Sequence, residues 1–191
     1  MSQVIMHAVV SVDGFIADDH DDVGPLFDWY FNGDRELEHM GMRLSSASYD
    51  YTRPLWDSIG ATIMGRRLFD QTNGWEARPP AGEHLVVVSH RPKPEGWHPE
   101  ADVPFYDDIP EAVAEARRRA GGRVVAVTAG DVGGQALAAG LVDHVAMDVV
   151  PVVFGRGKRY FGAVDGQVML GDPEVVVRGD RVLHLRYPVT R

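Results

Sequence analysis

Short apolar runs rich in β-branched residues recur along the chain, and Gly, Pro or charged residues bound them. Runs of this kind are typical of strands buried in a sheet. We expect the first run to form a central strand. The expected strands are Val4–Val12, Ala61–Met64, His84–Ser89, Arg123–Thr128, Val142–Val153, Val168–Met169, Val175–Val177 and Val182–Tyr187.

The segments between these runs favour helices. The clearest is 107–120, where Asp108 is a candidate N-terminal cap. A looser helical spacing extends from about 36 to 58 and includes Leu37 and Met40 on one face. Shorter helices are expected at 66–70 and 133–140.

Strands and helices alternate through the middle of the chain, which predicts the α/β fold class. We expect three α/β/α layers around a mainly parallel, mixed central sheet. The turn Arg178-Gly179-Asp180 predicts an antiparallel hairpin at the C-terminal end. With 191 residues, no internal repeat and no linker, residues 1–191 are expected to form one domain.

Composition narrows the possible functions. The chain has no cysteine, which excludes disulfides, a thiolate nucleophile and cysteine-ligated zinc. A net charge of -9 argues against a nucleic-acid partner. No apolar stretch approaches the roughly 18 residues of a membrane span, so we expect a cytoplasmic protein with no membrane partner. The acidic run 18–22 lacks the ligand spacing of a calcium loop, and no metal is expected.

Groups suited to binding phosphate follow three of the expected strands. Ligands of open α/β sheets bind where the carboxyl ends of strands meet. Guanidinium forks match phosphate oxygens, and a glycine turn leading into a helix exposes backbone N–H groups to an anion. Surface arginines and tight turns have the same appearance, so each signal alone is weak. The three groups are Gly65-Arg66-Arg67, Ser89-His90-Arg91 and Ala129-Gly130-Asp131-Val132 with Gln135.

The segment 18–34 is rich in Asp, Gly and Pro and predicts a long loop with an aromatic wall. Asp28 lies between Phe27 and Trp29, which would desolvate its carboxyl group and raise its pKa. Asp28 is therefore the candidate catalytic acid, and Phe27 and Trp29 are candidate substrate contacts. Alternatively, these two aromatic residues belong to the core and pin the loop.

Asp13 precedes Gly14 at the end of the first strand. Its carboxylate either closes an Asx-type turn or contacts the substrate. We include it among the candidate substrate-binding residues.

Taken in order, five segments resemble the dihydrofolate-reductase-like superfamily. The resemblance is narrower to the branch named after the reductase domain of the bacterial bifunctional riboflavin-biosynthesis deaminase-reductase. It covers nearly the whole chain, which contains no deaminase portion. The segments are Val9–Ala17, Met64–Arg67, Val88–Arg91, Ala138–His144 and Val150–Phe161.

The resemblance implies that NADPH is the cofactor. It places Ala8 of the first strand and Ile16 beside the nicotinamide. The groups around Arg66 and Arg91 would hold the adenosine phosphate, and those around Gly130 the pyrophosphate. Two departures are Thr128-Ala129, where paired glycines are usual, and His144, where an acidic residue is usual. The segment between Ala17 and Ala61 also differs and would form the substrate side.

We therefore expect an NADPH-dependent reductase that delivers hydride to a small planar heterocycle beneath the aromatic loop. The acceptor would be dihydrofolate-like, pterin-like or similar to 5-amino-6-(5-phosphoribosylamino)uracil of riboflavin biosynthesis. The alternative is a nucleotide- or ligand-binding protein of the same fold without turnover. The resemblance and the apolar strands 145–154 and 182–187 also predict a homodimer.

Overall fold

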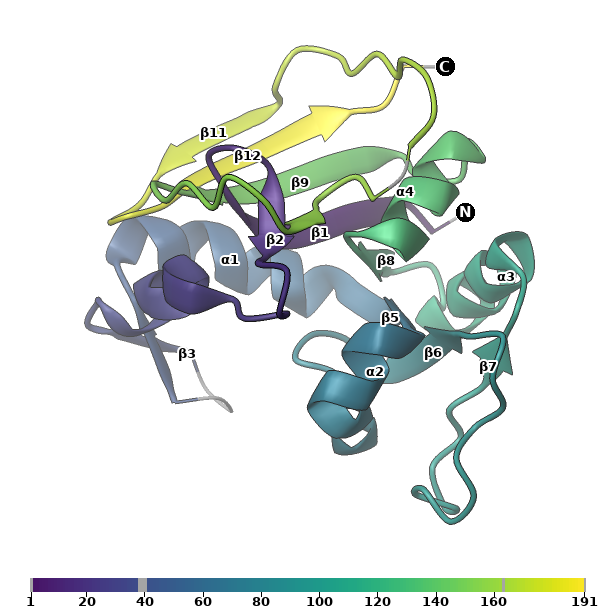
Figure 1. Ribbon diagram of the computed structural model, residues 1–191. Coiled ribbons are helices and arrows are strands. Elements are labelled where there is room, and N and C mark those ends of the chain that lie inside the picture. The colour runs from purple at the N-terminus through teal and green to yellow at the C-terminus, as the bar shows by residue number, and fades with distance from the viewer. Residues whose placement is uncertain (1, 38–40, 163, 191) are drawn as a thin grey trace.

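The computed structural model describes residues 2–37, 41–162 and 164–190 and is organised around an eight-stranded sheet (Figure 1). The strand order is β11-β12-β9-β1-β8-β5-β6-β7, so β1 has the predicted central position. All neighbours are parallel except β11 with β12 and β12 with β9. This is the predicted mainly parallel α/β sheet with an antiparallel C-terminal hairpin. The strands are β1 (Val4–Ser11), β5 (Ile59–Gly65), β6 (His84–Val88), β7 (Phe105–Tyr106), β8 (Val124–Thr128), β9 (His144–Val150), β11 (Val175–Arg178) and β12 (Leu183–Pro188).

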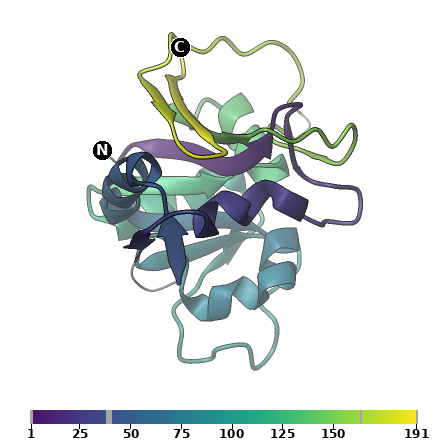
Figure 2. The same cartoon turned by 90° about the vertical axis from the view of Figure 1, so that its left-hand side faces the viewer.

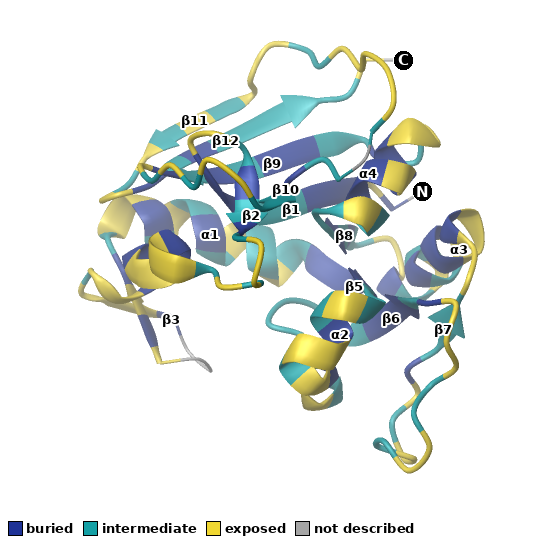
Figure 3. Ribbon diagram, in the orientation of Figure 1, coloured by how far each residue is buried: buried dark blue, intermediate teal, exposed yellow. Residues whose placement is uncertain are grey.

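Helices cover both faces of the sheet, giving the three predicted layers (Figures 1 and 2). Side chains alternate between the faces of a strand. Val10 therefore packs with α3 (Ile109–Ala120) and α4 (Asp131–Ala138), whereas Val9 packs with residues of α1 (Ser46–Ser58) and the 3-10 helix η1 (Gly24–Phe31). The short helix α2 (Arg66–Thr72), which continues into η2 (Asn73–Ala77), covers β5 and β6 on the same face as α1. Burial follows this pattern, with the central strands buried and much of α2 and η1 exposed (Figure 3).

The predicted helix 36–58 is wrong in its first part. There, β3 (Arg35–Leu37) and β4 (Met42–Leu44) form an antiparallel hairpin, and Met40 lies outside the described residues. Burial in β4 alternates with a strand period. Ser45 then caps α1 by accepting a hydrogen bond from the Ser48 backbone N–H.

The segment predicted as the loop 18–34 contains η1, and this helix divides its aromatic residues between two environments. Trp29 is 1% exposed and stacks on Tyr30 with ring centroids 4.0 Å apart. Phe27 and Phe31 are 42% and 62% exposed. A smaller antiparallel pair, β2 (Phe15–Ala17) with β10 (Lys158–Arg159), leads into this segment.

Two glycines let α4 lie close to its neighbours. A Cβ on Gly133 would lie 2.7 Å from the Thr128 carbonyl oxygen, and one on Gly134 only 2.1 Å from the Phe161 carbonyl oxygen. These residues are therefore required for packing, and the packing sets where α4 begins beside β8. In the part of the chain that the structure describes, no helix has the length and apolarity that a membrane crossing requires.

Candidate functional site

A cleft of about 1370 Å³ opens where β5, β6 and β8 end, and β1 contributes to its floor. The helices α1, α2 and η1 and the segment 157–162 complete its walls. Typical small-molecule pockets measure roughly 300–1,000 Å³, so this cleft has room for more than one small ligand.

The structure brings together all of the residues predicted to bind a cofactor. They come from β1, the β2 strand, the start of α2, the end of β6 and the turn between β8 and α4. All of them line the cleft: Ala8, Ile16, Gly65, Arg66, Arg67, Ser89, His90, Arg91, Ala129, Gly130, Asp131, Val132 and Gln135.

The turn at Gly130 presents the start of α4 to the cleft. Gly130 has φ +94, in the region that favours glycine, and its N–H donates to the Tyr160 carbonyl oxygen at 2.7 Å. The helix begins at Asp131, and its first backbone bond to close is Gly134 N–H to the Gly130 oxygen. The preceding N–H groups have no partner within the helix, which makes this end suitable for an anion.

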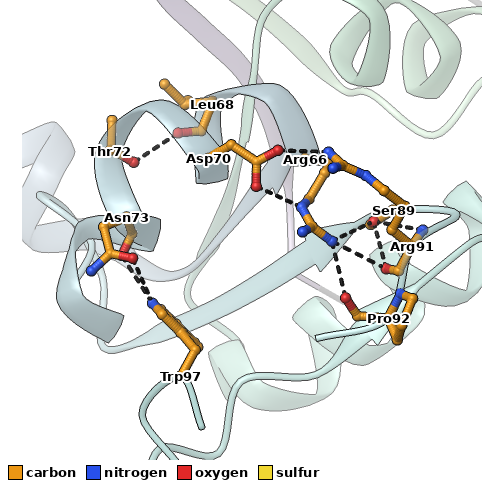
Figure 4. Close-up of polar contacts among 9 residues, drawn as sticks. All are labelled: Arg66, Leu68, Asp70, Thr72, Asn73, Ser89, Arg91, Pro92 and Trp97. Carbon is orange, nitrogen blue, oxygen red and sulfur yellow. Dashed lines mark hydrogen bonds and ion pairs between the residues drawn. The ribbon is translucent and has the colours of Figure 1, made fainter. Parts of the chain in front are cut away.

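Two arginines, Arg66 and Arg91, lie together where β6 ends (Figure 4). Arg66 donates to Asp70 at 2.7 Å and to the Pro92 carbonyl oxygen at 3.0 Å, and Arg91 donates to the other Asp70 oxygen at 2.6 Å. These two arginines, Arg66 first, hold the pKa of Asp70 below its ordinary value. Two guanidinium groups share one carboxylate, so the cluster keeps an excess positive charge.

The two arginines of this cluster differ in exposure. The Arg66 side chain is 17% exposed and is tied to the loop after β6, whereas that of Arg91 is 63% exposed. Arg91 is therefore the better placed of the two to meet a phosphate.

Arg67 points away from this cluster. It forms an ion pair with Asp21 of the segment after β2, and the hydrogen bond that it donates to Asp21 is the main cause that raises the Arg67 pKa. Asp131, the first residue of α4, also raises the Arg67 pKa. Arg66 and Arg67 were predicted together on the adenosine side, and the structure separates them.

The predicted substrate residues are mostly not in the cleft. Of Asp13, Phe27, Asp28 and Trp29, only Phe27 lines it. The expected desolvation of Asp28 is wrong, because its side chain lies exposed on η1. Trp29 belongs to the core, which was the alternative for this aromatic residue.

Asp13 has a structural role instead. Its carboxylate accepts hydrogen bonds from Ser11 Oγ at 2.7 Å and from the backbone N–H groups of Phe154 and Gly155. The Ser11 bond is the main cause that lowers the Asp13 pKa. This network joins the turn after β1 to the turn at 154–155. Asp13 therefore holds the backbone, as the Asx-type alternative supposed, although its N–H partners are distant in the sequence.

The structure also shows a polar chain that the sequence analysis missed. His7 Nε2 lies 2.9 Å from Asp148 Oδ2, Asp148 Oδ1 lies 2.6 Å from His184 Nδ1, and His184 Nε2 lies 2.9 Å from Ser48 Oγ. His7 lines the cleft. The available signal was a histidine and an aspartate, each within an otherwise apolar strand, but their pairing depends on strand register.

The order of the sheet, its layers and the cleft at the strand ends define a dihydrofolate-reductase-like α/β protein. The chain belongs to the RibD C-terminal domain family, whose model matches residues 2–184. The family predicted from the sequence is thereby confirmed.

Solved structures agree on the fold at low sequence identity. A protein from Shewanella sp. PV-4 assigned to riboflavin biosynthesis has a TM-score of 0.71 and 16% identity, and the match covers 100% of both chains. A pyrimidine reductase-like protein from Corynebacterium diphtheriae has a TM-score of 0.63 and 14% identity, covering 100% of this chain and 92% of that one.

One of the similar solved structures is of a longer chain. RibD from Acinetobacter baumannii has a TM-score of 0.61 and 16% identity over 100% of this chain, which spans 58% of that protein. A search among curated proteins gave no match.

Proposed function

We propose that this chain is an NADPH-dependent reductase that transfers hydride to a small planar heterocycle. The observation that carries the proposal is the cleft, which collects every residue predicted to contact the dinucleotide and leaves room for a second molecule. Membership of the RibD C-terminal domain family supports a reductase.

The cleft fits a dinucleotide phosphate in two respects. A Cβ added at Gly130 would lie 3.4 Å from Ile16 Cδ1, which also lines the cleft, so the glycine leaves this space to a ligand. The cationic residues that line the cleft favour an anionic ligand. They are Arg66, Arg67, Arg91, Lys158 and Arg159.

We assign the parts of the cofactor to these groups. The start of α4 and Arg67 would hold the pyrophosphate, and Arg91 with Ser89 the phosphate on the adenosine ribose. Ala8 and Ile16 would border the nicotinamide. When bound, NADPH would supply the hydride, and the protein would supply orientation and electrostatics.

Aromatic side chains offer a face for the acceptor. Phe27, Tyr30 and Trp56 all line the cleft, with neighbouring ring centroids 5.7 and 6.2 Å apart. A planar heterocycle would stack on such a wall while water is excluded. This arrangement supports a pterin, dihydrofolate or aminouracil type of acceptor.

The name of one solved structure supports the aminouracil as acceptor. One neighbour, from Thermotoga maritima, is named a diaminohydroxyphosphoribosylaminopyrimidine deaminase/5-amino-6-(5-phosphoribosylamino)uracil reductase and has a TM-score of 0.59 at 15% identity. The match covers 99% of this chain and 57% of that chain. We accordingly propose a role connected with riboflavin biosynthesis, in the cytoplasm.

Stopped-flow absorbance of the nicotinamide tests the proposal. The protein, preloaded with NADPH, is mixed with 7,8-dihydrofolate, folate, a dihydropterin or 5-amino-6-(5-phosphoribosylamino)uracil. We expect at least one acceptor to cause a rapid loss of the NADPH signal. Tight NADPH binding without any such loss would instead support a binding protein without turnover.

A further inference from the structure

The cleft contains one histidine that is fixed by a buried carboxylate. His7 lies in the middle of β1, and its side chain is 19% exposed. Its Nε2 is held by Asp148, whose side chain is only 3% exposed. Among the described residues, His7 Nδ1 has no hydrogen-bond partner and is left for a ligand.

Strand register explains why these residues meet. Asp148 of β9 is the direct partner of Val9 on one side and of His184 on the other. His7 is two residues before Val9 and therefore faces the same side of the sheet. His7 and Asp148 are diagonal neighbours, and Asp148 and His184 are direct ones. On this face Ser48, at the start of α1, closes the chain at His184.

The chain provides a buried negative charge behind His7. Burial alone would raise the pKa of Asp148, but the neighbouring His7 and the hydrogen bond from His184 outweigh it and hold that pKa below its ordinary range. A buried carboxylate is costly without a partner, and both imidazoles lie within hydrogen-bond distance of this one. His184 is fully buried, which leaves His7 as the imidazole that can exchange a proton with the cleft.

The other titratable side chains of the cleft are less suited to proton transfer. Asp21 is paired with Arg67, and the other lining histidines and carboxylates are exposed, namely His20, His90, Asp107 and Asp131. Tyr30 also lines the cleft, and burial together with the nearby Asp148 raises the pKa of its hydroxyl group. Asp28 lies outside the cleft, so the proton donor expected there must be sought elsewhere.

We propose that His7 contacts the hydride acceptor and donates the proton that accompanies hydride transfer, with Asp148 and His184 as positioning residues. This inference rests on the proposed reductase function. Hydride from nicotinamide C4 forms a C–H bond to the acceptor as its C=N or C=O π bond breaks. The released electron pair takes the proton from His7 Nδ1, NADPH is oxidised to NADP⁺, and water returns a proton to His7. The acceptor class is therefore a conjugated imine or carbonyl.

Binding and chemistry are separated with His7→Gln, Asp148→Asn and a matched control. His144→Gln is the control, because His144 also lies in the sheet beside a carboxylate, Glu174, but does not line the cleft. Calorimetry should give an NADPH Kd for His7→Gln within about twofold of wild type. Single-turnover hydride transfer to the acceptor found active should slow by about 10²-fold or more in His7→Gln, by less in Asp148→Asn, and not in the control.

Two further readouts distinguish a proton donor from a structural residue. Added imidazole should partly restore the rate of His7→Ala. In wild type loaded with NADP⁺, folate or the aminouracil should shift the NMR signals of the His7 ring and leave those of His144 unchanged. The NMR test does not depend on any variant folding.

The outcomes distinguish a failure of the role of His7 from a failure of the reductase function. A wild-type rate in His7→Gln, or a bound heterocycle that leaves the His7 ring signals unchanged, would overturn the role of His7 and leave the reductase intact. A wild-type protein that reduces none of the acceptors would overturn the proposed function, and the role of His7 with it.

Discussion

Arg91 and Arg66 share Asp70, yet their surroundings predict different roles. Arg91 is the more exposed of the two, whereas Arg66 is bonded to the loop after β6. We expect Arg91→Ala to weaken NADPH binding by about tenfold or more and to leave NADH nearly unchanged, since charge-assisted bonds contribute roughly 1.5–3 kcal/mol. Arg66→Ala should weaken both dinucleotides, because the loop loses its anchor. Calorimetry with both cofactors checks this, and equal loss for both in Arg91→Ala would contradict it.

At this scale the sequence predicts residues that lie at strand ends better than residues that meet across strands. Gly65, Ser89 and Gly130 each follow an apolar run, so their common edge could be predicted from local pattern. The pairing of His7 with Asp148 spans 141 positions and depends on strand order, which no local pattern contains. The predicted desolvation of Asp28 was wrong for a related reason, because the helical turn of η1 decides which side chains of this segment are buried.

Glu115 in α3 contributes stability that depends on pH. It accepts hydrogen bonds from Arg118 and Arg119, and these lower its pKa from 4.5 to about 2, with Arg118 the larger cause. Because the pKa is lowered by folding, the contribution is complete above about pH 4.5 and is lost as the pH falls toward 2. Glu115→Gln should lose about 0.5–1 kcal/mol at neutral pH and little near pH 2. Urea unfolding at several pH values checks this, and an equal loss at both ends would refute it.

The position of α4 depends on the close contact between Gly134 and the Phe161 carbonyl group. Gly134→Ala would push a methyl group into the Phe161 carbonyl, so we expect a loss of about 1–3 kcal/mol. Gly121→Ala is the matched control, because Gly121 has φ +60 but open space around it, and its cost should be about 1 kcal/mol. Thermal unfolding compares the two variants. A smaller loss in Gly134→Ala than in the control would show that α4 is not held by this contact.

Among the elements, those with strong boundaries were predicted well. The helix α3 begins after the predicted cap Asp108 and ends at Ala120, where the predicted helix also ends. The hairpin β3–β4 was missed because Leu37 and Leu44 fit a helical face as well as they fit alternate strand positions. Gly41, directly before β4, has φ +64, which lies outside the helical region.

For the whole molecule, the edge of the sheet supports the expected homodimer. Val176 of β11, Leu185 of β12 and Met147 of β9 are partners across three neighbouring strands, and Val176 is 60% exposed. An apolar row that ends on an unpaired edge strand invites a second copy. We predict a dimer in sedimentation at micromolar concentration, and Val176→Lys should shift it toward monomer. A wild-type monomer under these conditions would contradict the prediction.

The central claim is that the cleft transfers hydride from NADPH to a planar acceptor. NADPH carrying deuterium at both positions of nicotinamide C4 tests it most directly, with mass spectrometry of the product after a single turnover. We expect one deuterium in each product molecule, and no oxidation of the labelled NADPH when the acceptor is omitted. Oxidised NADPH with an unlabelled product, or an unreacted acceptor from the whole panel, would contradict it.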